Sequence, residues 1–227
     1  MMLFVCLKNK NMKRFGTIPV IALAFVFFSC NLSGQSKNGG VRKVSLTAPK
    51  GKAIASFAEG CFWCSEHIYE ALAGVDSAVS GYSGGKTINP TYEQVCSETT
   101  GHAESILVYY NPKVISYSQL LDAFFSSHDP TTLNRQGPDV GSSYRSAVFY
   151  LTPAEGELVK QAIAKWKPAF KSPIVTEVKR LTAFYRAEEY HQNYVVYNPS
   201  SGYVQGVSMP RFEQFKRTCK LTMKPKP

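Results

Sequence analysis

Hydrophobic residues in the middle of the chain follow two kinds of spacing. Short apolar or alternating runs predict strands, and apolar residues three and four positions apart predict helices. Ser116 can cap one helix, and Pro153 fits the first turn of another. From this pattern we expect strands at 53–58, 75–82, 106–110, 146–151 and 174–181, and helices at 62–73, after Ser116 and from Pro153 to Trp166.

The order of these expected elements is β-α-β-β-α-β-α-β. Its first six members match the split βαβ plait of ferredoxin-like folds, an antiparallel sheet with helices on one face. We therefore expect one α+β domain at 53–209. Two long stretches inside it, 84–103 and 128–144, show no periodic pattern. Loops of that length in a compact domain usually carry function.

The start of the chain has the features of a secretory signal. An apolar run from Ile18 to Phe28, broken by Pro19, follows the basic pair Lys13-Arg14. The run is too short to span a bilayer but matches the apolar core of a signal peptide. Met12 opens a better basic region than the residues before it, which look like an over-extended start.

Cys30 directly follows this apolar run. Ser29 precedes it, and a small residue followed by cysteine resembles the cleavage site of a bacterial lipoprotein, although Phe27 stands where such sites prefer leucine. We therefore expect residues 1–29 to be a lipoprotein-type signal peptide and Cys30 to carry the lipid. The protein would then be exported and anchored at the periplasmic face of a bacterial membrane. The alternative is an ordinary cleaved signal beside an incidental cysteine.

Basic residues are concentrated at the two ends of the chain. The formal net charge of +10 suggests nucleic acid or an anionic membrane as a partner. Residues 53–209, however, carry eleven Lys or Arg against fifteen Asp or Glu. We therefore expect no nucleic-acid-binding face. We also expect a monomer with a flexible tether at 30–52 and a basic tail at 210–227.

Cys61 lies between the first expected strand and the first expected helix, directly after Gly60. Backbone N–H groups at the start of a helix stabilise an anion, so a thiol there has a depressed pKa and is a candidate nucleophile. The alternative is a small cysteine packed in a strand–helix turn.

Large aromatic residues gather near the expected turns. Phe62 and Trp63 follow Cys61 directly, Tyr82 ends an expected strand, and Tyr92 and Tyr144 lie in the two long stretches without a periodic pattern. Apolar walls with a few hydroxyl groups suit a small neutral ligand such as a thioether methyl group. The alternative is ordinary core packing.

Five segments together resemble the peptide methionine sulfoxide reductases of the A type. The similarity runs from about Ala53 to about Val207, with the motifs in the family's order and spacing. The segments are GCFW (60–63), GYSGG (81–85), NPTYEQVCSETTGHAE (89–104), HDPTTLNRQGPDVGSSYRSAVFY (128–150) and AEEYHQNY (187–194).

This resemblance implies the roles of the site residues. Cys61 would attack the sulfur of methionine S-sulfoxide, free or in oxidised proteins and peptides, and Glu104 would protonate the departing oxygen. A carboxyl that does this near pH 7 must stay neutral in an apolar site. The residues implied to hold the substrate are Tyr92 and Tyr144 at the oxygen, Phe62 and Trp63 at the methyl group, and Asp139 at the pocket and the substrate backbone.

A second thiol must condense with the sulfenic acid that forms at Cys61. The family commonly has glycine at position 64 and a recycling cysteine near the C-terminus, whereas this chain has Cys64, and its Cys61-x-x-Cys64 spacing permits a disulfide. We favour Cys64, with Cys219 on a mobile tail as the alternative, and we interpret Cys96 as a packed small residue. A thioredoxin-like reductant would recycle the disulfide.

Two other functions remain open from the residues alone. One is a membrane-tethered thiol–disulfide exchange protein that uses Cys61 and Cys64, and the other is a non-catalytic domain with a structural disulfide. We expect no metal, because no four ligands have zinc spacing, and His67 and His191 are expected to be surface or satisfied residues. No phosphate loop or dinucleotide fingerprint is present in the sequence, so we expect no cofactor.

Overall fold

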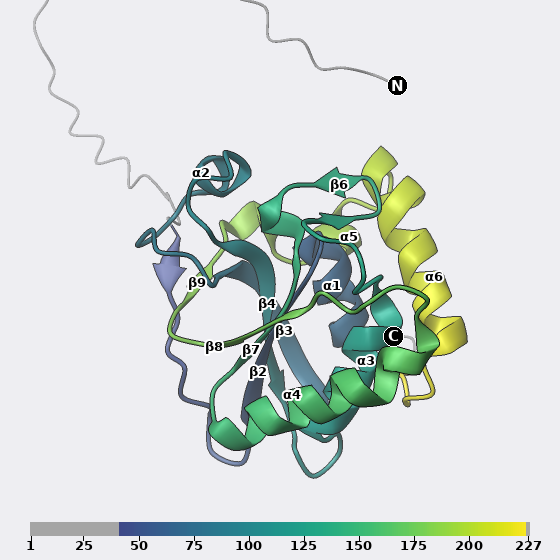
Figure 1. Ribbon diagram of the computed structural model, residues 1–227. Coiled ribbons are helices and arrows are strands. Elements are labelled where there is room, and N and C mark those ends of the chain that lie inside the picture. Colours follow the sequence, from purple (N-terminus) through teal and green to yellow (C-terminus); the bar gives the residue numbers. More distant parts are fainter. Residues whose placement is uncertain (1–40, 226–227) are drawn as a thin grey trace, which may run out of the picture. The chain divides into compact units, whose positions relative to one another are not determined.

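One seven-stranded sheet runs through the part of the chain that the computed structural model describes, residues 41–225. In chain order its strands are β1 (Arg42–Lys43), β2 (Ala53–Glu59), β3 (Val75–Ser83), β4 (Ala103–Tyr110), β7 (Ser146–Tyr150), β8 (Glu177–Arg180) and β9 (Phe184–Arg186). Their order across the sheet is β1-β9-β3-β4-β2-β7-β8 (Figure 1). A separate two-stranded hairpin joins β5 (Arg135–Gln136) to β6 (Asp139–Val140).

The sheet is mixed, so the expectation of a fully antiparallel sheet is wrong at one edge. β3, β4, β2 and β7 pair antiparallel, whereas β8 lies parallel to β7. The connection between β7 and β8 contains α4 (Pro153–Trp166). A strand that returns to a sheet through a crossover helix enters parallel to the strand before it. The architecture is therefore a mixed α+β fold.

The helices begin where the sequence supplies caps. Ser116 and Thr152 each form a capping box, with a glutamine or glutamate three residues later. The predicted helix at 62–73 ends at Glu70, three residues early. The remaining helices are α1 (Phe62–Glu70), α2 (Tyr92–Cys96), α3 (Tyr117–Ser127), α5 (Tyr194–Tyr197) and α6 (Met209–Thr218).

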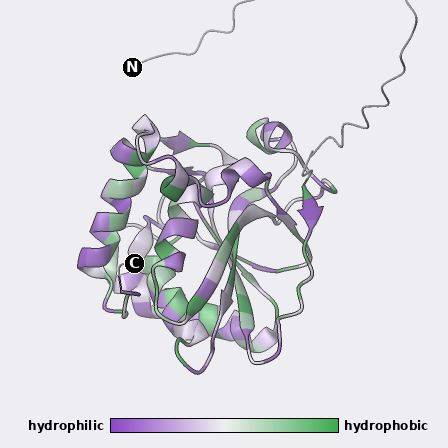
Figure 2. Ribbon diagram, turned by 180° about the vertical axis from the view of Figure 1, so that it is seen from behind, coloured by the Kyte–Doolittle hydropathy of each residue, from purple (hydrophilic) through white to green (hydrophobic). Residues whose placement is uncertain are grey.

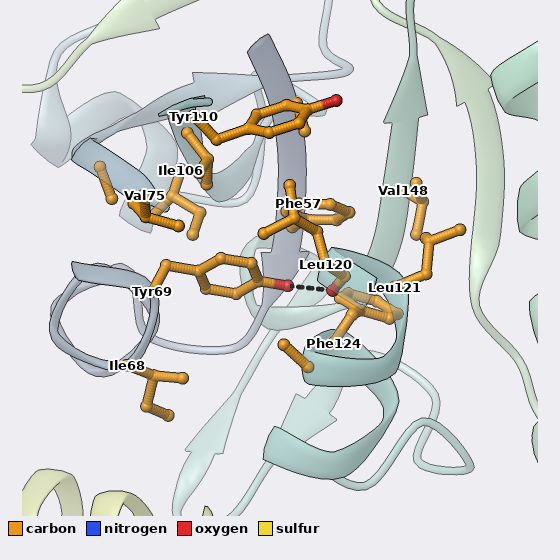
Figure 3. Close-up of a cluster of buried hydrophobic side chains, with 14 of the residues drawn as sticks. Phe57, Ile68, Tyr69, Val75, Ile106, Tyr110, Leu120, Leu121, Phe124 and Val148 are labelled. Atoms are coloured by element: carbon orange, nitrogen blue, oxygen red, sulfur yellow. Dashed lines mark hydrogen bonds between the residues drawn. The ribbon is translucent and has the colours of Figure 1, made fainter. Parts of the chain in front are cut away.

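The larger hydrophobic core fills the space between the sheet and α1, α3 and α4. Phe57 of β2 stacks on Tyr69 of α1 at 5.1 Å between ring centroids and packs against Phe124 of α3. The Tyr69 hydroxyl donates a hydrogen bond of 3.1 Å to the Leu120 carbonyl, which joins the two helices (Figure 3). α1 is therefore held rigidly against the strand whose end precedes Cys61.

The N-terminal part of the described chain runs along the sheet. β1 pairs antiparallel with β9, and Val44, Leu46 and Ala48 pack against a second, smaller core cluster. The expected tether at 30–52 is therefore ordered from residue 41 onward. The expected signal peptide at 1–29 and Cys30 lie outside the described residues. Within those residues, no helix has both the length and the apolar character needed to cross a membrane.

The C-terminal segment is part of the fold. α6 alternates polar and apolar segments (Figure 2) and buries Phe215 completely. Beyond it, Met223 forms a bridge with Leu72, and the Lys224 N–H donates to the Ala71 carbonyl at 2.7 Å. The expectation of a mobile tail is wrong as far as Lys224, because the chain is fixed to the end of α1.

Candidate active site

Cys61 lies in a tight turn between β2 and α1 and caps the start of that helix. Gly60 makes the turn with φ of +91°, a conformation that side chains rarely adopt. A Cβ atom at this position would lie 2.6 Å from the Cβ of Gln136. Cys61 is 6% exposed, so the turn presents a nearly buried thiol at one end of the sheet.

Glu104 approaches the same turn from β4. The strand begins at Ala103, earlier than the predicted 106, and this places Glu104 within the sheet opposite Tyr82. Its Oε2 accepts a 3.1 Å hydrogen bond from the backbone N–H of Phe62, next to Cys61. Burial raises the pKa of Glu104 to about 8. The carboxyl is therefore protonated near neutral pH, as a general acid must be.

Two turns, each held by hydrogen bonds to a glutamate, bring Tyr92 and Tyr144 towards Glu104. Tyr92 opens α2 and donates its backbone N–H to Glu188 at 3.0 Å. Tyr144 ends the 3₁₀ turn η1 (Ser142–Tyr144), whose preceding serines bind the Glu98 carboxylate. Burial, and then the nearby Glu104 carboxyl, raise the pKa of both phenols. Both hydroxyl groups therefore remain hydrogen-bond donors.

Aromatic rings surround the start of α1. Trp63 stacks on Tyr194 with 3.7 Å between ring centroids and an interplanar angle of 9°. Its indole N–H donates to Nδ1 of His191 at 3.1 Å, and the His191 ring lies 5.0 Å from that of Phe62. These contacts fix both predicted methyl-binding rings beside Cys61.

Asp139 reaches the site from the β5–β6 hairpin. Its Oδ2 accepts a 2.6 Å hydrogen bond from the hydroxyl of Tyr203, whose ring meets Trp63 edge-on. Burial raises the pKa of Asp139. Asp139 is thus tied to the aromatic wall through Tyr203, a residue that the sequence analysis did not single out.

Cys61 and Cys64 form a pair of interacting thiols on the first turn of α1. Burial, together with the neighbouring Cys64, raises the pKa of Cys61. The hydrogen bond from Cys61 lowers the pKa of Cys64 to about 6, with further help from Arg211 and from Ser208, whose Oγ lies 3.2 Å from the Cys64 sulfur. The predicted low pKa of Cys61 is therefore wrong in the substrate-free site, because the pair keeps its negative charge on Cys64.

The other two free cysteines of the described chain lie elsewhere. Cys219 caps the far end of α6, eleven residues beyond Ser208, which at 1.5 Å per residue is roughly 16 Å along the helix axis. Cys96 is exposed at the end of α2 rather than packed as predicted. Cys64 is thus the only one of these three cysteines in contact with Cys61.

Several residues at the site were missed or misread in the sequence. His191, predicted to be a surface or satisfied residue, is 1% exposed, and its Nε2 has no hydrogen-bond partner. The AEEYHQNY segment was the signal that could have identified it. Ser208 and Arg211 lie in a region without a motif, so only the folded chain reveals their position.

In residues 41–225, His, Cys, Asp and Glu side chains form no group of three or more that could hold a metal ion.

The chain matches a family model described as peptide methionine sulfoxide reductase over residues 53–223. Peptide methionine sulfoxide reductase MsrA 1 of Rhodopirellula baltica is 45% identical over 174 residues, which cover 77% of this chain and 91% of that protein. The MsrA of Natronomonas pharaonis is 50% identical over 163 residues, which cover 71% of this chain and 92% of that protein.

Solved structures show the same similarity. Mxr1 from Saccharomyces cerevisiae in its reduced form superposes with a TM-score of 0.64 at 36% identity, covering 71% of this chain and 91% of that one. Methionine sulfoxide reductase A of Corynebacterium diphtheriae gives a TM-score of 0.63 at 32% identity, covering 67% of this chain and 78% of that one.

Proposed function

Because the chain belongs to the peptide methionine sulfoxide reductase family and reduces methionine sulfoxide with a thiol, we propose that Cys61 attacks the substrate and Glu104 supplies the proton. One observation carries this assignment. A buried, protonated carboxyl is hydrogen-bonded to the residue that follows Cys61. The family match disfavours the alternative of a thiol–disulfide exchange protein without a sulfoxide pocket.

In the first step, the Cys61 sulfur attacks the sulfoxide sulfur while its proton moves to the Cys64 thiolate. Glu104 gives its proton to the sulfoxide oxygen. The hydroxyl group made by this protonation is then transferred to the Cys61 sulfur: the sulfur–oxygen bond of the substrate and the new bond between the two sulfur atoms both break, and Cys61 becomes a sulfenic acid. Methionine leaves, and Glu104 is left as a carboxylate.

The surrounding residues hold the sulfoxide for this attack. The hydroxyl groups of Tyr92 and Tyr144 would donate hydrogen bonds to its oxygen, and the rings of Phe62 and Trp63 would contact its methyl group. Asp139, held by Tyr203, would help fix the pocket and the backbone of an oxidised protein or peptide. Such a chiral arrangement of acid, hydroxyl groups and aromatic wall suits one sulfoxide epimer, which we propose is the S form.

In the second step, we propose that Cys64 resolves the sulfenic acid. Glu104 takes the Cys64 proton, the Cys64 sulfur attacks Cys61, and the departing hydroxide leaves with that proton as water. A thioredoxin-like dithiol then reduces the disulfide and becomes a disulfide itself. One of the two protons returned to the thiols restores Glu104 to its acid form, so the cycle closes.

A single-turnover experiment tests these roles. Reduced protein mixed with excess methionine sulfoxide should form methionine and a Cys61–Cys64 disulfide. Cys61→Ser should form no methionine, whereas Cys219→Ser, a change at the far end of α6, should form methionine at the normal rate. Reductase activity that survived in Cys61→Ser would overturn the assignment of the nucleophile.

The resolving cysteine is tested separately. Cys64→Ala should release one methionine and then stop as the sulfenic acid, and Cys219→Ala should turn over normally with thioredoxin. The opposite result would identify Cys219 as the resolving cysteine, and α6 would then have to leave its position for each turnover.

The location of the protein is a further part of the proposal. The apolar run before Cys30 supports export, cleavage after Ser29 and a lipid anchor at a bacterial membrane. The intact mass of the protein from the membrane fraction would reveal both cleavage and lipid. A mass that corresponds to the uncleaved chain would contradict this proposal.

For the fold, we propose that the four central strands with α1 and α3 correspond to a ferredoxin-like plait. The strand order β3-β4-β2-β7 with antiparallel pairing supports it. β8, β9 and β1 would then be additions at the two edges.

A further inference from the structure

Arg211 carries a positive charge into the interior of the protein. It lies within a continuous helical segment that runs through the π-helical turn Val204–Ser208 into α6. Its side chain is only 13% exposed, so water does little to compensate that charge. A cation buried in this way requires a stabilising partner in the fold.

Two hydrogen bonds hold the guanidinium group of Arg211. Its Nη2 donates to Oε1 of Glu59 at 2.8 Å, and its Nε donates to the Ser127 carbonyl at 2.8 Å. Glu59 is the last residue of β2 and is fully buried. The ion pair therefore joins α6 to the strand that leads into the Cys61 turn.

The remaining nitrogen of the guanidinium group, Nη1, faces this turn. It lies 3.7 Å from the point that a Cβ atom on Gly60 would occupy. Ser208, three residues earlier and hence on the same side of the helical segment, lies against the sulfur of Cys64. Ser208 and Arg211 thus approach the thiol pair together, from the side of α6.

Most ionisable groups around the pair are acidic. Cys64 interacts electrostatically with Glu59, Glu104, Asp139 and the phenol of Tyr203. Burial raises the pKa of Glu59 to about 7 and that of Glu104 to about 8, so both are mostly protonated at the pH where Cys64 loses its proton. Arg211 is the cation among the groups that interact with Cys64. His128, near Glu59, is kept neutral because burial lowers its pKa to about 3.

We propose that Arg211 is a positioning residue that stabilises the thiolate of Cys64, with Glu59 and Ser127 fixing the guanidinium group and the Ser208 hydroxyl lying at hydrogen-bond distance from the Cys64 sulfur. This proposal rests on Cys64 being the resolving cysteine. The thiolate is the nucleophile in disulfide formation, so the cation would accelerate the step in which Cys64 attacks the sulfenic acid of Cys61.

Substitutions that separate the charge of Arg211 from its place in the fold test the proposal. Arg211→Met removes the cation and keeps the volume, so Cys64 should lose its proton only at higher pH. Arg211→Lys keeps the charge and should retain most of the wild-type behaviour. Glu59→Gln keeps the cation and an acceptor for its hydrogen bond, and Glu59 is mostly protonated near pH 6, so this variant should keep the wild-type midpoint. A purely structural role would shift the midpoint in Glu59→Gln as much as in Arg211→Met.

The measurement is the rate of Cys61–Cys64 disulfide formation after one turnover, followed by rapid quenching with a thiol reagent and mass spectrometry from pH 5 to 9. In Arg211→Met, the midpoint of the rise with pH should move up by about one unit, which below the midpoint is about a tenfold loss of rate because rate follows the thiolate fraction. In Glu59→Gln, the midpoint should stay where it is in the wild-type protein.

The outcomes separate this proposal from the one on which it rests. If the wild-type protein forms methionine without a Cys61–Cys64 disulfide, the resolving role of Cys64 fails, and this inference fails with it. If the disulfide forms but Arg211→Met keeps the wild-type midpoint, or Glu59→Gln shifts it as much as Arg211→Met does, only the role of Arg211 fails. Should Arg211→Met not fold, Arg211→Gln, which removes the charge and keeps hydrogen-bond donors, takes its place: a raised midpoint supports the proposal, and an unchanged one overturns it.

Discussion

At the scale of single residues, the reaction depends on which ionisable groups of the buried site keep their protons near neutral pH. Burial keeps a proton on Glu104 up to a pH of about 8, whereas Cys64, in the same site, has a pKa of about 6. An acid and a thiolate therefore coexist near neutral pH. Both are needed, since the sulfoxide oxygen must gain a proton while Cys61 gives one up.

Glu104→Gln should reduce the rate of methionine formation by a factor of about 10²–10⁴, which is the usual contribution of a general acid to a reaction rate. In the wild-type protein, the same rate should decline as the pH rises through about 8, because the carboxyl then loses its proton. The residual rate of the variant should lack this decline. Single-turnover rates measured from pH 6 to 9.5 check both expectations, and a decline that persisted in Glu104→Gln would assign it to another group.

Some residues could be predicted from the sequence and others could not. Cys61 and Glu104 lie in segments whose spacing resembles a known family, and the structure brings them together. Arg211 and Ser208 lie in no such segment, and their contacts span 152 and 144 residues of chain. Local patterns carry no information on contacts of that range, so the sequence offered no signal for this part of the site.

At the scale of elements, the turn between β2 and α1 determines where the thiol lies. Gly60→Ala should destabilise the protein by more than the ~1–2 kcal/mol that a left-handed residue costs. Its new Cβ would also overlap Gln136 and push the Cys61 turn out of place. Urea unfolding and the single-turnover rate should therefore both be impaired.

Gly51→Ala is the matched control for this change. Gly51 also has a positive φ, of +75°, but no atom lies within 4 Å of its Cβ position. The control should lose stability in urea unfolding through backbone strain alone, and its rate of methionine formation should be unchanged. Equal losses of rate in the two variants would show that the turn does not position the thiol.

The elements themselves were predicted unevenly. The strands and helices with clear periodicity appear within a few residues of their expected ends. α3 begins after the predicted cap Ser116, and α4 begins at Pro153 as predicted. The parallel pairing of β8 was missed, although the helix before it implied a crossover. β1 and β9 are two and three residues long, too short for periodicity to reveal.

At the scale of the whole molecule, buried carboxyls tie stability to pH. The folded-state pKa of Glu104 is raised from 4.5 to about 8, so the stability associated with its proton is present below pH 4.5 and is lost as the pH rises through 8. Glu104→Gln cannot lose a proton. Relative to the wild-type protein, it should therefore gain stability between about pH 5 and pH 8.5.

Urea unfolding of both proteins at pH 5, 7 and 8.5 measures this gain. The difference between them isolates Glu104 from the thiol pair and the buried histidines, which titrate in both proteins. A difference that did not change with pH would mean that Glu104 ionises in the folded protein as readily as in the unfolded one, and its role as an acid would then be lost.

The ion pair between Glu59 and Arg211 also has a consequence for how the protein is made. The strand that ends at Glu59 is synthesised early, and α6 is synthesised 152 residues later. Until α6 docks, Cys64 has neither Ser208 nor Arg211 beside it. While the chain is still being synthesised, the two thiols would therefore react slowly, and this would protect them from oxidation. Cys64 would gain its reactivity only once α6 has docked and the fold is complete.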